Sequence, residues 1–301
     1  MQTHNKLLHW ILLNSVKTSE FRRYFVCYGG LKIMDPNTAI STGLFALASK
    51  DLLSKVLGPT AEYLGEGLRD FSKRRTENIK SIFDRAVRHL GSKLNEPGVV
   101  SPRILSRVIN DGQYCEDSLV AEYYGGLLAS SRGEDANDDR LLPFIEVVRS
   151  LSLYEIRTHY VFCHTLKNLY NGEKLSVRLL AERHKLRVYI PSHSWINAIG
   201  IESHPNPYKI LSEVFYGLGR RRIIDSEALM GPKQFLVKKG LCCAEDHGVI
   251  YMLEPFGIDI MLHISGYPDT GSESFLQRSI KLIEIPDINI PIDAKKGELT
   301  K

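Results

Sequence analysis

The stretch LGEGLRDFSKRRTENIKSIFDRAVRHL, residues 64–90, decides the fold, because apolar side chains recur in it mostly at steps of three and four residues. That spacing is the period of one helix face, so we expect a long helix with a buried apolar stripe and a basic outer side. Pro59 suits the first turn of this helix, and Gly91 follows its last apolar residue. The stripe consists of Leu64, Leu68, Phe71, Ile79, Ile82, Phe83, Ala86, Val87 and Leu90.

The composition is that of a folded protein with an ordinary core. Of the 301 residues, 43% are hydrophobic and 25% are charged, which argues against disorder. The 39 basic residues exceed the 35 acidic ones by only 4, so the net charge does not require a nucleic-acid partner. Five cysteines show neither zinc-ligand spacing nor a disulfide framework, and an odd number suits reduced thiols in the cytoplasm.

Further helices are predicted along the first two thirds of the chain. They cover residues 46–57, a segment from Pro102, and residues 117–130, 142–151 and 153–170. Ser152 with Glu155 three positions later is a capping-box pattern at the start of the last one. Gly125 and Gly126 lack side chains, which predicts that another helix approaches closely there.

The last third predicts short strands among helices. Residues 187–190 are a strand candidate, and residues 226–239 a helix that Gly231-Pro232 could shorten to a start at Lys233. Two strands at 241–245 and 249–253 would form a hairpin, followed by a helix from Pro255. This order resembles the end of a winged-helix fold. A further strand is expected at 279–285, and residues 294–301 are expected to fray.

The predicted fold class is therefore mainly α, a helical bundle followed by a winged-helix-like α+β C-terminal domain. We place an N-terminal helical domain at 34–151, the helical and winged-helix-like domain at 152–266 and a C-terminal tail at 267–301. Residues 29–34 can be encoded by a ribosome-binding sequence just before a start codon, so we interpret residues 1–33 as a non-native N-terminal extension. A genuine N-terminal helix is the alternative.

Two blocks of sequence carry a family resemblance. The first joins LGPTAEYLG, residues 57–65, to KRRTENI, residues 73–79, and the second is YCEDSLVAEYYGGLLASS, residues 114–131. Both resemble the Abi-alpha (abortive infection alpha) family, and the similarity extends over roughly residues 45–265. The resemblance implies a bacterial antiphage role, but the family brings no established catalytic residues. We expect no cofactor, no metal and no enzymatic activity.

Basic residues near the winged-helix-like region are the candidate contacts for a partner. Lysines and arginines neutralise phosphates in nucleic-acid complexes, but Gln234 is the main side chain here that could read a base. A protein contact or a solvated face is the alternative, because winged-helix shapes also dock proteins. The candidates are Arg220, Arg221, Arg222, Lys233, Gln234, Lys238 and Lys239.

A charged loop between two predicted helices is the second candidate region. Its carboxylates could bind a hard cation, but their spacing lacks the pattern of a calcium loop, so a solvated loop is the plainer interpretation. Its charged residues are Arg132, Glu134, Asp135, Asp138, Asp139 and Arg140.

Other reactive side chains receive structural interpretations. His159 and His164 lie five positions apart, which does not suit a metal pair on one helix face, so each is expected at the edge of the core. Cys115 is followed by Glu116 and Asp117, whose charges would raise its thiol pKa and make it unreactive.

The sequence thus predicts a non-enzymatic interaction or effector protein whose partner is a phage product or a cellular protein. Two alternatives stay open: a membrane-perturbing effector acting through residues 40–68 on a membrane surface, and a nucleic-acid-binding regulator acting through the C-terminal basic residues. Association into a homo-oligomer is also left open.

Overall fold

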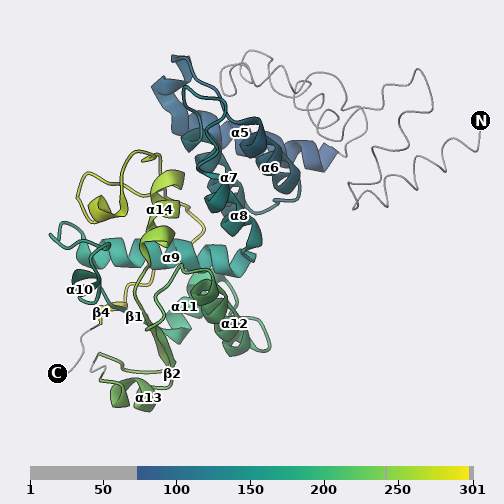
Figure 1. Ribbon diagram of the computed structural model, residues 1–301. Coiled ribbons are helices and arrows are strands. Elements are labelled where there is room, and N and C mark those ends of the chain that lie inside the picture. Colours follow the sequence, from purple (N-terminus) through teal and green to yellow (C-terminus); the bar gives the residue numbers. More distant parts are fainter. Residues whose placement is uncertain (1–72, 241–242, 298–301) are drawn as a thin grey trace, which may run out of the picture. The chain divides into compact units, whose positions relative to one another are not determined.

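The computed structural model describes residues 73–240 and 243–297 (Figure 1). The interpretation of residues 1–33, the predicted helix at 46–57 and the membrane alternative at 40–68 all lie outside the described residues.

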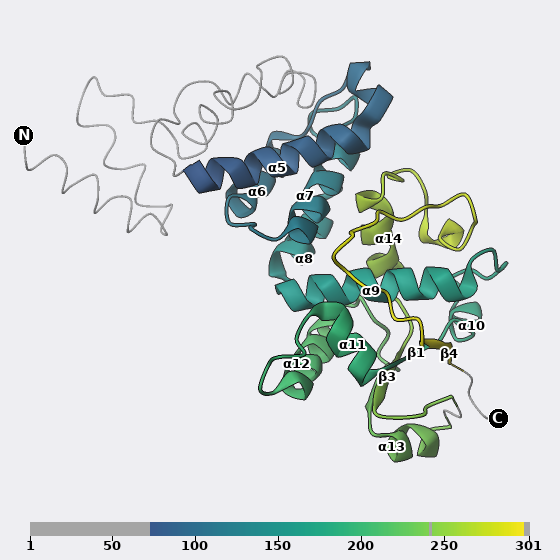
Figure 2. The same cartoon turned by 180° about the vertical axis from the view of Figure 1, so that it is seen from behind.

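Helices fill the first part of the described chain. They are α5 (Lys73–Leu90), the 3-10 turn η2 (Gly91–Asn95), α6 (Pro102–Gly112), α7 (Ser118–Ser130) and α8 (Leu142–Ser150). Figure 2 shows α5 lying across α6 and α7. The described part of the predicted α5 stripe is confirmed, because Ile79, Ile82, Phe83, Ala86 and Leu90 are all buried.

The glycine pair of α7 brings two other helices against its backbone. A Cβ atom at Gly125 would lie 2.6 Å from the Cβ of Arg85 in α5. A Cβ atom at Gly126 would lie 2.5 Å from the Cα of Ile264 in α14 (Pro255–Ile264). The predicted close approach is therefore confirmed, and it occurs with a different helix at each glycine.

Helix α9 (Leu153–Tyr170) starts as predicted, with a capping box. The Ser152 amide donates to Glu155 Oε2 at 2.7 Å, and the Glu155 amide donates to Ser152 Oγ at 3.3 Å. Four helices pack against α9: α7, α14, α11 (Ser192–Ile199) and α12 (Pro207–Arg220). The short α10 (Leu180–Arg183) follows it in the chain.

The described strands form one small antiparallel sheet in the order β2-β3-β1-β4. They are β1 (Val188–Pro191), β2 (Leu229–Gly231), β3 (Gly248–Tyr251) and β4 (Lys295–Lys296). Strand β1 agrees with the strand expected at 187–190, and its Val188 lies opposite Tyr251 of β3. The protein is thus mainly helical with a small sheet.

The winged-helix-like arrangement is not confirmed. The continuous helix at 226–239 is wrong, because residues 229–231 pair as β2 and α13 (Lys233–Lys238) begins only after Pro232. Proline has no amide hydrogen to donate and disfavours helical geometry in the residue before it. The alternative start at Lys233 is confirmed.

The predicted hairpin before Pro255 is also wrong in its pairing. Residues 243–245 form no strand, and residues 241–242 lie outside the described chain. Strand β3 pairs instead with β1 and β2, which lie earlier in the sequence. Strand β3 therefore has a partner strand on each side, and neither partner is the adjacent segment that a hairpin turn would supply.

Two predictions for the C-terminal segment are wrong as well. Residues 279–285 are irregular, since the Ile285 amide donates to the Tyr160 hydroxyl at 2.8 Å and that hydroxyl donates to the Ile283 carbonyl at 3.2 Å. The Tyr160 hydroxyl therefore bonds a backbone amide and a backbone carbonyl that would otherwise pair with a neighbouring strand. Of the residues expected to fray, Lys295 and Lys296 instead pair with β1 as β4, and residues 298–301 lie outside the described chain.

One cluster of buried side chains runs from Ile79 to Ala294 and crosses both of the domain boundaries drawn at 151 and 266. Phe275 and Leu276, next to the 3-10 turn η3 (Ser272–Ser274), belong to it. Among the described helices, none combines the length and the apolar character that a membrane crossing requires.

Candidate functional site

The predicted charged loop leaves α7 and is tied down by Arg132. Its guanidinium donates to the Lys93 carbonyl at 3.0 Å and to the Glu96 carbonyl, at the end of η2. Val99 and Gly133 exchange two backbone hydrogen bonds of 2.8 and 3.0 Å beside it. Arg132 therefore holds the loop against the turn that follows α5, which is a positioning role.

Most carboxylates of the loop have partners within the described chain. Asp138 accepts hydrogen bonds from Arg140 at 2.7 to 3.1 Å, and these bonds lower the pKa of its carboxyl group. Asp139 pairs with Arg103, and Asp135 accepts from the Asn137 amide at 2.8 Å. No group of three or more metal-ligating side chains occurs in the described residues, so the hard-cation interpretation finds no ligand set there.

A cavity of about 650 Å³ borders this loop. Its lining comes from the ends of α5, α7 and α14, from the charged loop, and from residues 266–269 after α14. Four of the predicted loop residues contribute to it: Arg132, Glu134, Asp138 and Arg140. Segments far apart in the sequence thus meet at the loop that the sequence marked as a candidate.

His263 is the titratable side chain of α14 at this cavity. Burial lowers its pKa, so the imidazole is neutral near pH 7. Its ring meets the ring of Phe144 edge-on, with centroids 4.8 Å apart. Its Nδ1 atom is buried and has no hydrogen-bond partner among the described residues.

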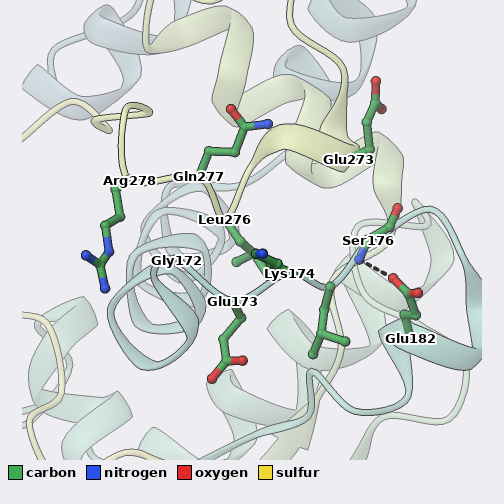
Figure 3. A pocket seen from close by; sticks show the side chains of 10 residues that line it. Gly172, Glu173, Lys174, Ser176, Glu182, Glu273, Leu276, Gln277 and Arg278 are labelled. Atoms are coloured by element: carbon green, nitrogen blue, oxygen red, sulfur yellow. Dashed lines mark hydrogen bonds between the residues drawn. The ribbon is translucent and has the colours of Figure 1, made fainter.

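A second cavity, of about 410 Å³, lies between the turn after α9 and the segment after η3. Figure 3 shows that the charged ends of Glu173, Glu273 and Arg278 point away from one another. Glu182 accepts a hydrogen bond from the Ser176 amide and so shapes the loop. The described polar side chains that line this second cavity do not converge on a common point.

Helix α13 carries the predicted lysines on an exposed surface. Leu236 is its buried residue and packs with Tyr189, Ala244 and Ile250. Phe235 and Val237 are 37% and 47% exposed, so two apolar side chains of this helix lie at the surface. The lysines and the glutamine, Lys233, Gln234, Lys238 and Lys239, are all exposed.

The three predicted arginines do not join this surface. Arg221 donates to Glu155 Oε1 at 3.0 Å and to Ser150 Oγ at 2.8 Å, which fastens the end of α12 to the start of α9. The arginines are followed by Ile224, which lies opposite Leu253. Helix α13 is preceded by Gly231, which lies opposite Gly248. Leu253 and Gly248 are five residues of extended chain apart, so the arginines and α13 are separated by roughly 17 Å.

Two other side chains with potential reactivity, Cys115 and His159, lie in buried surroundings. Burial raises the pKa of the Cys115 thiol to about 12, and the charges of Asp111 and Asp117 add to the effect. The raised pKa agrees with the expected direction, but burial is the main cause and Asp111 acts in place of the expected Glu116. His159 is fully buried between α7, α9 and α14, a core position rather than a ligand position.

Sequence reasoning missed Phe235 and Val237 as surface residues and did not find His263 or Asp269. The break at Pro232 was a signal for the first pair, because a helix of one and a half turns buries only one side. No local motif marks the second pair, which reaches the cavity only through packing of α14 on α7.

Comparison with known proteins adds no relative. No family model matches the chain, and neither the curated proteins nor the solved structures give a match. The resemblance to the Abi-alpha family stays a prediction made from the sequence.

Proposed function

We propose that the protein is a non-enzymatic interaction module of antiphage defence that binds an acidic protein partner through α13. The defence context comes from the Abi-alpha resemblance of the sequence. The mode of contact comes from one observation: Lys233 and Lys238 of α13, and Lys239 directly after it, are exposed, and none of them pairs with a carboxylate of the described chain.

The arrangement of side chains around α13 favours a binding surface over a merely solvated one. With about 100° between successive residues, Gln234 and Lys238 lie opposite the buried Leu236. Phe235 and Val237 flank them on either side. Aromatic side chains are enriched at protein interfaces, and charged side chains beside them steer a partner of opposite charge.

A protein partner accounts for this surface better than a nucleic acid does. Phosphate groups would bind the lysines but would leave Phe235 and Val237 without apolar contacts. Six helical residues span only about 9 Å and offer Gln234 alone for base reading. The arginines at 220–222, which would extend a phosphate-binding surface, lie at the other end of β3.

The helix is held firmly enough to present these groups in a fixed arrangement. Leu236 packs against Tyr189 of β1 and Ile250 of β3, and the Phe235 ring covers Gly231, where a Cβ atom would lie 2.9 Å from it. A surface that is already ordered loses less conformational entropy on binding.

A charge-reversal experiment tests the proposal. The variant Lys233→Glu/Lys238→Glu/Lys239→Glu should lose most of the protection against phage that the parent protein gives, measured as plating efficiency. A photo-crosslinking residue placed at Gln234 should yield a protein adduct during infection, and this adduct should disappear with the triple reversal.

The matched control reverses three exposed lysines elsewhere, Lys174, Lys185 and Lys281, and changes the net charge by the same amount. It should retain protection and the adduct. Full protection by the α13 variant, or an adduct that consists of nucleic acid, would overturn the proposed contact.

A further inference from the structure

We propose that the cavity where α5, α7 and α14 end binds a small organic cation, with an ammonium or guanidinium head and an apolar body. This site is separate from α13 and goes beyond the proposed function. The cavity volume of about 650 Å³ lies in the range of small-molecule sites.

The charges that line the cavity favour a cation. Four carboxylates and three lysine or arginine side chains line it, so the carboxylates outnumber these basic groups by one. Arg140 is paired with Asp138, and Arg132 donates to two backbone carbonyls. The carboxylates are Glu96, Glu134, Asp138 and Asp269, and the basic residues are Lys93, Arg132 and Arg140.

Two of these carboxylates are available to a ligand. Glu134 and Asp269 are exposed, and neither makes a hydrogen bond or a salt bridge with the described residues. Asp269 acts through its charge on both Arg140 and His263, which places it near these two lining residues.

The helix ends add to the negative potential. Residues at the C-terminal ends of α5, α7 and α14 all line the cavity: Leu90, Ser130 and His263. A helix C-terminus carries roughly half a negative charge from its aligned peptide dipoles. The Ser130 hydroxyl donates to the His263 carbonyl at 2.6 Å, and the backbone amides that follow α7 and α14 donate to other carbonyls of their last turns, which reduces this potential. An anionic ligand would meet three unfavourable dipoles here.

The inner wall is apolar and suits a hydrocarbon body. Leu90, Ile104 and Leu141 are buried side chains that line the cavity. Phe144 also lines it, and its ring is fixed by stacking on Phe256 at a centroid distance of 4.9 Å.

His263 lines the cavity as a neutral side chain, because burial lowers the pKa of its imidazole. Its ring therefore adds no positive charge that would repel a cation.

Calorimetric titration of the full chain with spermidine tests the inference. We expect saturable one-to-one binding, with a Kd below about 1 mM, and at least a tenfold loss of affinity in Glu134→Gln/Asp269→Asn. The control Glu202→Gln/Asp287→Asn changes two exposed carboxylates elsewhere and should bind as the parent does. A shift of the thermal midpoint by spermidine should follow the same order.

Three results would overturn the site: no saturable binding, equal affinity of the two double variants, or tighter binding of pyrophosphate than of spermidine. The triple α13 variant separates this inference from the proposed function. It should bind spermidine as the parent does. A failure of the α13 contact would therefore leave the cavity site standing, and a failure of the cavity site would leave the α13 contact standing.

Discussion

The hydroxyl oxygen of Tyr123 lies 2.6 Å from Nδ1 of His159, and Nε2 of the same ring lies 2.8 Å from the Gly257 carbonyl oxygen. A carbonyl only accepts, so Nε2 carries the proton and Nδ1 accepts from the tyrosine. This pair of bonds joins α7, α9 and α14 through one neutral imidazole.

Acid should therefore weaken the fold before carboxylates titrate. Burial lowers the pKa values of His159 and His164 to about 4 each, from 6.5 in the unfolded chain. Between these values the unfolded state binds the protons, so stability falls as the pH drops from about 6.5 to 4. Each histidine contributes a loss of up to roughly 3 kcal/mol. Urea unfolding at pH 7 and 4.5 measures it, and equal midpoints would contradict it.

Glycine-to-alanine changes in two helices should act in opposite directions. Gly126→Ala places a Cβ atom 2.5 Å from the backbone of Ile264 and should destabilise the protein by roughly 1–3 kcal/mol. Gly219→Ala in α12 meets nothing within 4 Å and should stabilise it by about 0.5–1 kcal/mol. Thermal unfolding compares the two. A neutral Gly126→Ala would mean that α14 does not pack there.

Neutralising Glu122 should loosen α5 from α7. This carboxylate is buried and lies 2.7 Å from His89, 2.9 Å from Arg85 and 3.2 Å from Arg88. Burial opposes its ionisation, but the hydrogen bond from His89 and the charges of Arg88 and Arg85 outweigh it and lower the pKa. We expect Glu122→Gln to lose roughly 3 kcal/mol, because the mostly buried Arg85 loses its charged partner.

Hydrogen exchange of the α5 amides, faster in Glu122→Gln than in the parent, would locate the effect. Lys80→Gln is the control, since its pair with Asp84 lies within α5 and is largely exposed. It should change stability by less than about 1 kcal/mol. A Glu122 variant that unfolds like this control would show that the cluster does not fasten the two helices.

Helix α13 should depend on a single side chain for its folding. Leu236→Ala removes its buried contact and should cost about 2–4 kcal/mol, whereas Val237→Ser should stay within about 0.5 kcal/mol. Urea unfolding of the two variants gives the comparison. A large loss with Val237→Ser would mean that this residue is packed, and the proposed binding surface would then lose an apolar flank.

Local signals foretold the helices better than the sheet. Helix α9 carries its own cap in Ser152 and Glu155, and α14 begins at Pro255 as expected. Strands β2 and β4 have three and two residues, too few for an alternating pattern, and they exist because β3 and β1 pair with them. The positions of β2 and β4 depend on pairing with distant segments, which the sequence around each strand does not reveal.

The cavity, too, could be predicted from the sequence only in part. The charged loop stood out through turn residues and charges within one segment, and the structure places Arg132, Glu134, Asp138 and Arg140 at a cavity. Its opposite wall comes from His263 and Asp269, more than 120 residues later. Only the packing of α14 against Gly126 brings them there.

The two glycines of α7 also bear on how the chain is made. Helix α5 covers one flank of α7 early in synthesis, but α14 covers the other only after residue 264 has left the ribosome. Until then the nascent protein exposes the backbone groove at Gly126 and the apolar side chains around it. Folding of the helices around α7 is thereby completed only after α14 has been synthesised.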